Sequence, residues 1–175
     1  MNSPILRFYR GGSDHDGRSL DEILAWDDEQ LETCHDYIQW LFPLDEPSAY
    51  NPDAPTLSTQ DRSEFERDPL LQQRLLAALA RLLGFYGFQL EATTAGVDVR
   101  PGPLFDVQQQ RWLTPQNHNF LRITRILRSL VLLGQRPYAA ALLRCLEHVY
   151  AQHAQRIGAT SLGFWRQALE LDPEG

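Results

Sequence analysis

Lysine is absent from this chain, because all 16 basic residues are arginine. A phosphate-binding loop ending in Gly-Lys-Ser or Gly-Lys-Thr is therefore excluded, as is a Schiff base on a lysine side chain. The sequence also lacks a Gly-x-Ser-x-Gly elbow, a His-Glu-x-x-His helix and a Cys-x-x-Cys pair. The usual catalytic signatures are thus missing, and we predict no catalytic residue, no metal site and no cofactor.

Cysteine is scarce, with only Cys34 and Cys145 in the chain. Each lies in an apolar helical pattern, where a free thiol behaves as a small hydrophobic side chain. A disulfide is not favoured, because the sequence shows neither a signal peptide nor a cysteine framework. For Cys34 beside His35, we prefer a buried, inert thiol over a reactive thiolate. His148 and His153 do not share a helix face, so no metal site is predicted there.

Long hydrophobic runs and an excess of positive charge are also missing. No apolar run approaches the roughly 18 residues that a membrane-spanning helix needs. The net charge of −7 argues against a nucleic-acid partner, because phosphates require a cationic surface. The chain of 175 residues fits one domain with its own hydrophobic core. We expect a soluble, cytoplasmic protein, and the sequence leaves its oligomeric state open.

Apolar residues at helical spacing predict an all-α, single-domain bundle of about seven or eight helices. One apolar stripe is expected on a helix that ends at Pro43, formed by Leu31, Cys34, Ile38 and Leu41. The clearest helix follows Asp68 and spans residues 69–86. Other helices are expected near residues 20–26, 58–67, 105–112, 117–133, 137–157 and 161–169.

Two segments are predicted to lie outside helices. Residues 43–57 contain four prolines, which predicts an ordered connection. Residues 91–103 combine Gly96 and Pro101 with further glycine and proline, which predicts a loop. No two-residue alternation typical of a strand stands out. Residues 1–18 are interpreted as an N-terminal lead that packs on a domain of residues 19–171.

Three separated segments carry a family resemblance: residues 35–43 (HDYIQWLFP), 83–87 (LGFYG) and 117–127 (NHNFLRITRIL). In this order they resemble the conserved N-terminal region of the opioid growth factor receptor family, with a similarity that runs from Arg7 to about Tyr150. Animal members of the family are described as nuclear or perinuclear proteins that bind an enkephalin-type growth factor and restrain cell proliferation. The resemblance implies a bare, bacterial form of the domain, without the long C-terminal extensions of those members. It carries over no catalytic residue.

Polar residues within two of these segments are the candidate ligand-binding residues: His35, Asp36, Gln39, Asn117, His118, Arg122 and Arg125. Arginines in a row can bind a carboxylate, a phosphate or an acidic peptide. Alternatively, these arginines pair with acidic residues in or shortly before residues 35–43 and tie two helices together. The candidates for that pairing are Asp27, Asp28, Glu32 and Asp36.

Two functions follow from these patterns. The preferred hypothesis is a non-enzymatic binding module for a peptide, a small anionic ligand or a partner protein. The alternative is an enzyme of undescribed type that uses a polar cluster around His35, Asp36, His118 and Arg122. For His35 and Asp36, structural hydrogen bonds to other helices or to the proline-rich connection are the preferred interpretation.

Overall fold

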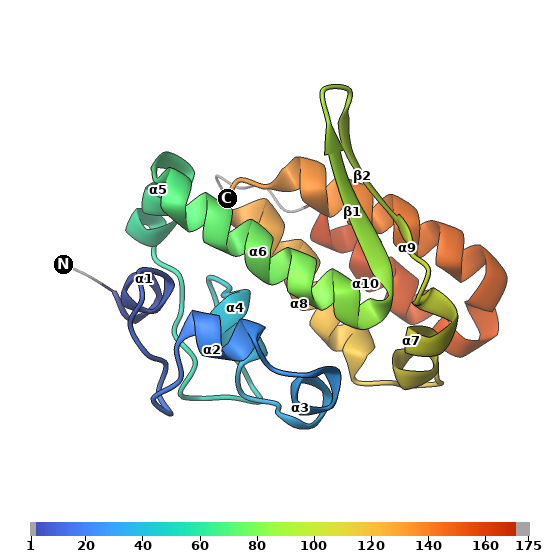
Figure 1. Ribbon diagram of the computed structural model, residues 1–175, viewed down its shortest axis with the longest axis horizontal. Coiled ribbons are helices and arrows are strands. Elements are labelled where there is room, and N and C mark those ends of the chain that lie inside the picture. The colour runs from blue at the N-terminus through green and yellow to red at the C-terminus, as the bar shows by residue number, and fades with distance from the viewer. Residues whose placement is uncertain (1–2, 171–175) are drawn as a thin grey trace. The chain divides into compact units, whose positions relative to one another are not determined.

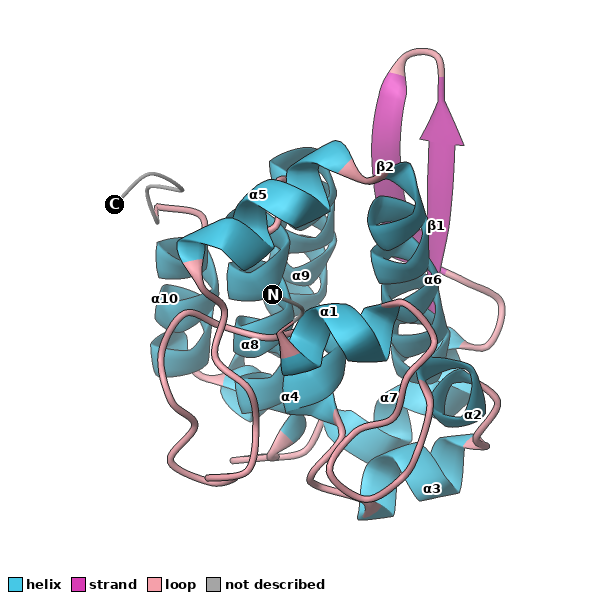
Figure 2. Ribbon diagram, turned by 90° about the vertical axis from the view of Figure 1, so that its left-hand side faces the viewer, coloured by secondary structure: helices cyan, strands magenta, loops and turns pink. Residues whose placement is uncertain are grey.

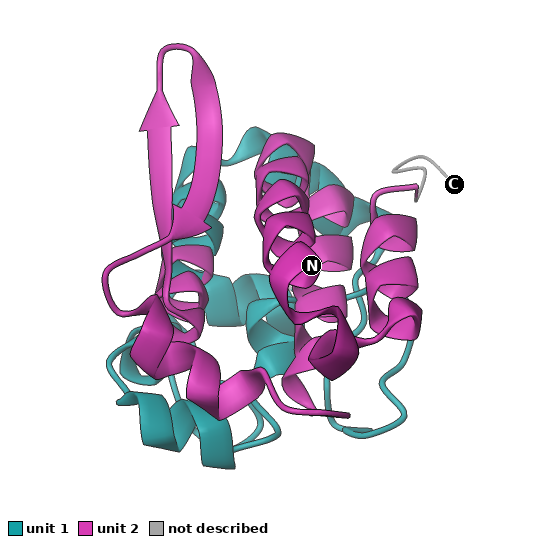
Figure 3. Ribbon diagram, turned by 90° about the vertical axis from the view of Figure 1, so that its right-hand side faces the viewer, with its two compact units in different colours: residues 1–78 teal, residues 79–175 magenta. Residues whose placement is uncertain are grey.

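The computed structural model describes residues 3–170 and divides the chain into two compact units, residues 1–78 and 79–175 (Figure 3). The described residues form 10 helices and one two-stranded sheet (Figures 1 and 2). The predicted helical fold class is confirmed, with a small hairpin added. Among residues 3–170, no helix is long and apolar enough to cross a membrane.

The first unit consists of five short helices and the beginning of a long one. They are α1 (Pro4–Tyr9), α2 (Leu20–Leu24), α3 (Asp28–Thr33), α4 (Ile38–Leu41), α5 (Thr59–Arg67) and α6 (Pro69–Tyr86). Helix α6 continues across the boundary into the second unit. Helices α2, α3 and α5 begin after Ser19, Asp27 and Ser58, and each of these side chains accepts a hydrogen bond from a backbone amide of its helix.

Aromatic side chains pack together within the first unit. Phe8 and Tyr9 of α1 are fully buried. The ring of Phe8 lies 5.3 Å from that of Trp40, and the ring of Tyr9 lies 5.0 Å from that of Phe65. The Tyr9 hydroxyl donates a hydrogen bond to the carbonyl of Leu41. The predicted N-terminal lead therefore contains a helix with a buried face. The predicted domain end at residue 171 lies outside the described residues.

The single helix expected over Leu31 to Leu41 is wrong, because α3 ends at Thr33 and α4 begins at Ile38. Cys34 adopts an extended conformation and lies half-buried, not on a helical apolar stripe. The Tyr37 hydroxyl donates to the Leu31 carbonyl at 2.8 Å, which supplies a partner near the end of α3. Because of this interruption, the thiol of Cys34 and the carboxylate of Asp36 both contact Arg18, which lies outside these two helices.

The proline-rich connection, residues 43–57, contains no helix or strand, as predicted. Its two ends are held together by a hydrogen bond from the Leu57 amide to the Leu44 carbonyl, at 2.8 Å. The side chain of Asn51 is buried within it. The connection is thus an ordered loop with fixed internal contacts.

Up to residue 170, the second unit contains the hairpin, the end of α6 and four further helices. Besides the end of α6 it holds β1 (Phe88–Thr93), β2 (Gly96–Pro101), α7 (Phe105–Trp112), α8 (Asn119–Leu132), α9 (Arg136–Ile157) and α10 (Ala159–Ala168). Helices α8, α9 and α10 pack on one another, and β2 lies along α9 (Figure 1). The indole of Trp165 donates to the Phe120 carbonyl at 3.1 Å, which fixes α10 against α8.

Gly87 makes the tight passage from α6 into β1. Its φ of +88° lies in the left-handed region, which glycine adopts most readily. A Cβ at this position would lie 2.7 Å from the Cα of Phe105. Next to this turn, the indole of Trp112 donates to the Tyr86 carbonyl at 3.1 Å. Glycine is therefore required at position 87 for two reasons, the positive φ and the lack of space for a Cβ beside Phe105.

The loop expected over residues 91–103 is wrong, because much of it forms the antiparallel hairpin. Leu90 pairs with Val99 and Ala92 with Val97, and the turn lies between Thr93 and Gly96. Most of the hairpin side chains are exposed, so burial leaves only a weak alternation along each strand. Pro101 sits at the end of β2, a position where the sheet tolerates proline.

Candidate functional site

Asp36, one of the predicted site residues, is the centre of a polar cluster in the first unit. It lies between α3 and α4, and its side chain is 41% exposed. Arg18 Nη1 donates to Asp36 Oδ1 at 3.0 Å, and Cys34 Sγ donates to the same oxygen at 3.1 Å. His15 Nε2 lies 3.3 Å from the other oxygen, Oδ2. Both carboxylate oxygens are therefore engaged.

Arg18 bridges two carboxylates in this cluster. Its Nε donates to Asp14 Oδ2 at 2.8 Å, while Nη1 holds Asp36. The Asp14 side chain has no exposed surface, and its Oδ1 accepts the backbone amides of Asp16 and Arg18, each at 2.9 Å. The guanidinium also lies over the Trp26 ring, 5.5 Å from the centroid. These contacts fix the arginine in one orientation.

His15 uses both of its ring nitrogens. The indole of Trp40 donates to His15 Nδ1 at 3.1 Å, so this nitrogen acts as the acceptor. The proton then resides on Nε2, which faces Asp36. A general base needs a free imidazole lone pair within reach of a substrate. In this tautomer the lone pair of His15 is already bonded to Trp40.

The electrostatics of the cluster favour an ionised Asp36 and a protonated Cys34. Burial alone would raise the pKa of Asp36, but hydrogen bonds from Cys34 and Arg18 outweigh it and hold that pKa below its ordinary value. Burial, together with the hydrogen bond to the Asp36 carboxylate, raises the pKa of the Cys34 thiol. Because the thiolate is the nucleophilic form, Cys34 is a poor nucleophile at neutral pH.

The proline-rich connection reaches the same region through Asn51. Its Nδ2 donates to the Asp36 carbonyl at 3.2 Å and to Gln39 Oε1 at 3.3 Å. Gln39 Nε2 in turn donates to the His35 carbonyl at 3.4 Å, and Gln39 is 6% exposed. The structure thus brings Asp36 and Gln39 together around Asn51, while the residue His35 is exposed.

The other predicted site residues lie in the second unit, around the beginning of α8. Asn117 Nδ2 donates to the Arg111 carbonyl at 3.2 Å, and its Oδ1 accepts the Asn119 amide at 2.9 Å. Asn117 therefore connects the end of α7 to the start of α8. His118 is exposed at the N-cap position of α8.

The two predicted arginines lie on α8 itself. Arg122 is buried, 6% exposed, and Arg125 is half-buried. The predicted sites at His35 and Asp36 belong to the first unit, and those at His118 and Arg122 belong to the second. Both the ion pairs and the shared polar cluster predicted between these segments stay predictions.

Sequence reasoning missed Asp14, His15 and Arg18, which complete the cluster around Asp36. The available signal was the segment Ser13-Asp14-His15-Asp16-Gly17. In such a turn-forming segment an aspartate side chain often accepts a hydrogen bond from the amide two residues later, which is an Asx turn. Asp14 forms such a turn with the amide of Asp16. Among residues 3–170, no three His, Cys, Asp or Glu side chains are arranged to hold a metal ion.

Comparison with known proteins identifies the family. A family model described as the opioid growth factor receptor conserved region matches residues 2–173. The opioid growth factor receptor of Rattus norvegicus is 41% identical over 143 residues, which cover 78% of this chain and 24% of that protein. For the receptor of Homo sapiens the identity is 39% over 150 residues, covering 82% of this chain and 21% of that protein.

A further relative carries a different name. Opioid growth factor receptor-like protein 1 of Mus musculus is 38% identical over 148 residues, which cover 82% of this chain and 31% of that protein. The chain therefore spans less than a third of the length of each of these relatives. No solved structure matches the chain. The resemblance carried by residues 35–43, 83–87 and 117–127 is confirmed, and the chain belongs to the opioid growth factor receptor conserved-region family.

Proposed function

We propose that this chain is a non-enzymatic binding module whose ligand is a peptide. The relatives of rat and human are named receptors of a growth factor, which supports a binding role for the region they share with this chain. The segment matched in each relative is only a part of a longer protein, so the proposal concerns binding by this region alone. A small anionic ligand or a partner protein would be other forms of the same binding role.

The observation that carries the proposal is the state of His15. Both ring nitrogens of His15 have partners: Nε2 faces Asp36, and Nδ1 accepts a hydrogen bond from Trp40. The neighbouring thiol of Cys34 donates to Asp36, and its pKa is raised. A catalytic pair would instead present a free lone pair or a thiolate to a substrate. The cluster is better suited to holding α3, α4 and the segment before α2 in place.

A calorimetric titration tests the binding role. The chain is titrated with an enkephalin-type peptide and, as a control, with the same amino acids in scrambled order. The matched region of the human relative serves as the comparator, because it is 39% identical over 150 residues. Saturable binding of the ordered peptide alone supports the proposal. Binding by the human region without binding by this chain would contradict it.

A thiol titration tests the non-enzymatic part of the proposal. The two cysteines are free, and burial raises the pKa of Cys145 to about 12. We expect both thiols of the folded chain to react with an aromatic disulfide at neutral pH at least about tenfold more slowly than those of the urea-unfolded chain. One fast-reacting thiol in the folded chain that disappears in Cys34→Ser would show an activated nucleophile and overturn this part.

A further inference from the structure

Helix α9 is interrupted at His153, five residues before Gly158, the glycine at which the helix ends. His153 has φ of −135° and ψ of 31°, outside the helical region. Kinks in helices usually arise at proline, at glycine and serine pairs, or where a group inserts between turns. Residues 138–157 contain no proline, glycine or serine. The local sequence therefore gives no reason for the break, which lies next to a hollow in the surface.

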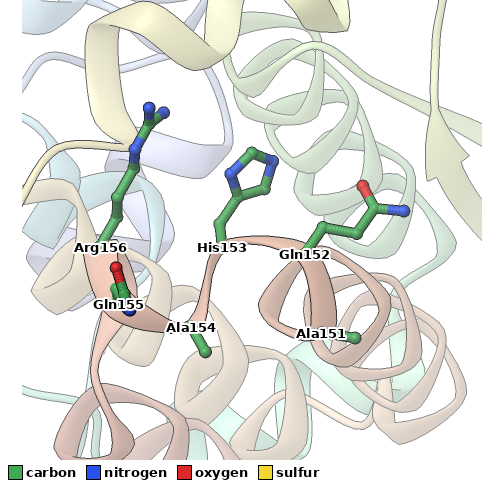
Figure 4. Close-up of a pocket in the computed structure, with 6 residues that line it drawn as sticks. All are labelled: Ala151, Gln152, His153, Ala154, Gln155 and Arg156. Atoms are coloured by element: carbon green, nitrogen blue, oxygen red, sulfur yellow. The ribbon is translucent and has the colours of Figure 1, made fainter.

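The hollow has a volume of about 500 Å³ and is lined by residues 151–156. Its lining comes from one segment of α9 alone, so the hollow is an open depression in the surface and not an enclosed pocket. Figure 4 shows the side chains of Gln152, His153 and Arg156 extending to the same side of the helix. The methyl group of Ala154 points away from them (Figure 4). The kink thus collects three nitrogen-bearing side chains around one open space.

These three side chains offer hydrogen-bond donors that nothing in the described part of the chain uses. Between residues 3 and 170, Gln152, His153 and Arg156 have no side-chain hydrogen bond or ion pair. His153 is half-buried, whereas Gln152 and Arg156 are exposed. A guanidinium presents a planar fork of N–H groups that matches an oxyanion, and amide and imidazole N–H groups add neutral donors.

The surrounding segment is free of negative charge although the chain as a whole is acidic. The chain has 23 Asp and Glu residues, yet none occurs between positions 148 and 169. The acidic residue just before this segment, Glu147, accepts from Arg166 Nε at 3.0 Å. An anion entering the hollow therefore meets cationic and neutral donors from this segment and no carboxylate.

We propose that this hollow is a binding site for a small oxyanion, a carboxylate or a phosphate monoester, with Arg156 as the charged fork and Gln152 and His153 as additional donors. The site shares no residue with the Asp36 cluster and does not depend on whether the chain binds a peptide. Arg156 supplies the charge that the ligand needs, and the open hollow leaves room for the remainder of a small molecule. The break at His153 is what places these donors around one space.

The test is a titration of the whole chain with inorganic phosphate and, separately, with succinate, at ionic strength matched with sodium chloride. Amide chemical shifts report the location, and we expect at least one of the two anions to bind saturably and to move the signals of residues 151–156. Arg156→Gln should weaken that binding at least about tenfold. Arg67→Gln, which removes the same charge from an exposed position of α5, should leave the binding unchanged.

Each outcome decides the proposal. Binding of phosphate alone identifies a phosphate site, and binding of succinate alone identifies a carboxylate site. Absence of saturable binding of both anions up to about 10 mM would overturn the site. Equal weakening by Arg156→Gln and Arg67→Gln would also overturn it, because the effect would then reflect net charge and not the hollow.

Discussion

At the scale of single residues, Arg18 is the cationic partner of the buried carboxylate of Asp14. Asp14 is fully buried at its side chain, and Arg18 Nε and Nη2 both lie 2.8 Å from its Oδ2. We expect Arg18→Gln to lower the free energy of unfolding by about 2–3 kcal/mol, because a buried charge would lose its partner. Chemical denaturation measures the change. Arg67→Gln is the control and should change stability by less than about 0.5 kcal/mol.

Asp36 gives stability a pH dependence of definite sign. Its pKa in the folded chain lies below the ordinary value, so the folded state favours the carboxylate. This contribution is fully present above the unfolded pKa of about 4 and is lost as the pH falls toward the folded pKa. We expect Asp36→Asn to lose less stability than the wild type between neutral pH and about pH 3. Asp45→Asn, at an exposed position, is the control. An identical pH dependence of the wild type and Asp36→Asn would show that Asp36 contributes nothing.

At the scale of secondary-structure elements, Gly87 determines how α6 passes into the hairpin. We expect Gly87→Ala to destabilise the chain by about 2–4 kcal/mol, because alanine disfavours the positive φ and its methyl group would collide with Phe105. The matched control is Gly84→Ala, an exposed position within α6 with no atom near the new Cβ. That change should stabilise the chain by about 0.5–1 kcal/mol. Equal effects of the two changes would contradict this account of the turn.

Helix ends with local signals were predictable at this scale, and tertiary interruptions were not. Ser19, Ser58 and Asp68 cap helices through contacts only two or three residues away, which a sequence pattern records. The break after Thr33 depends on Arg18 and Tyr37, whose contacts no local pattern reveals. The hairpin left only a weak alternation in Phe88, Leu90 and Ala92, and nearby glycine and proline favoured a loop.

The candidate site was only partly predictable for a similar reason. Asp36 and Gln39 stood out as polar residues in an apolar segment, and both lie in the network around Asn51. Their partners Asp14, His15 and Arg18 come from a loop about twenty residues earlier, and a helical wheel cannot relate that loop to Asp36. The kink at His153 has no signal in its own sequence, because the residues around it are ordinary in helices.

At the scale of the whole molecule, family membership and the Asp36 cluster both support the binding role that we propose for this chain. The family assignment connects the chain to regions of larger proteins named as receptors. The cluster uses its histidine, thiol, arginine and carboxylates on one another. Under the proposed binding role, such a network is required only to maintain the fold of the first unit. An enzyme would leave at least one of these groups available to a substrate.

The nitrogen-15 chemical shifts of the His15 imidazole test this central claim most directly. Measured at about pH 8, where a free imidazole is uncharged and carries one N–H proton, these shifts report which nitrogen carries that proton. The account predicts a protonated Nε2 facing Asp36 and an unprotonated Nδ1 that accepts from Trp40. In Trp40→Phe the Nδ1 shift should move toward that of a free histidine. A proton on Nδ1 in the wild type, or rapid exchange between both tautomers, would contradict the account.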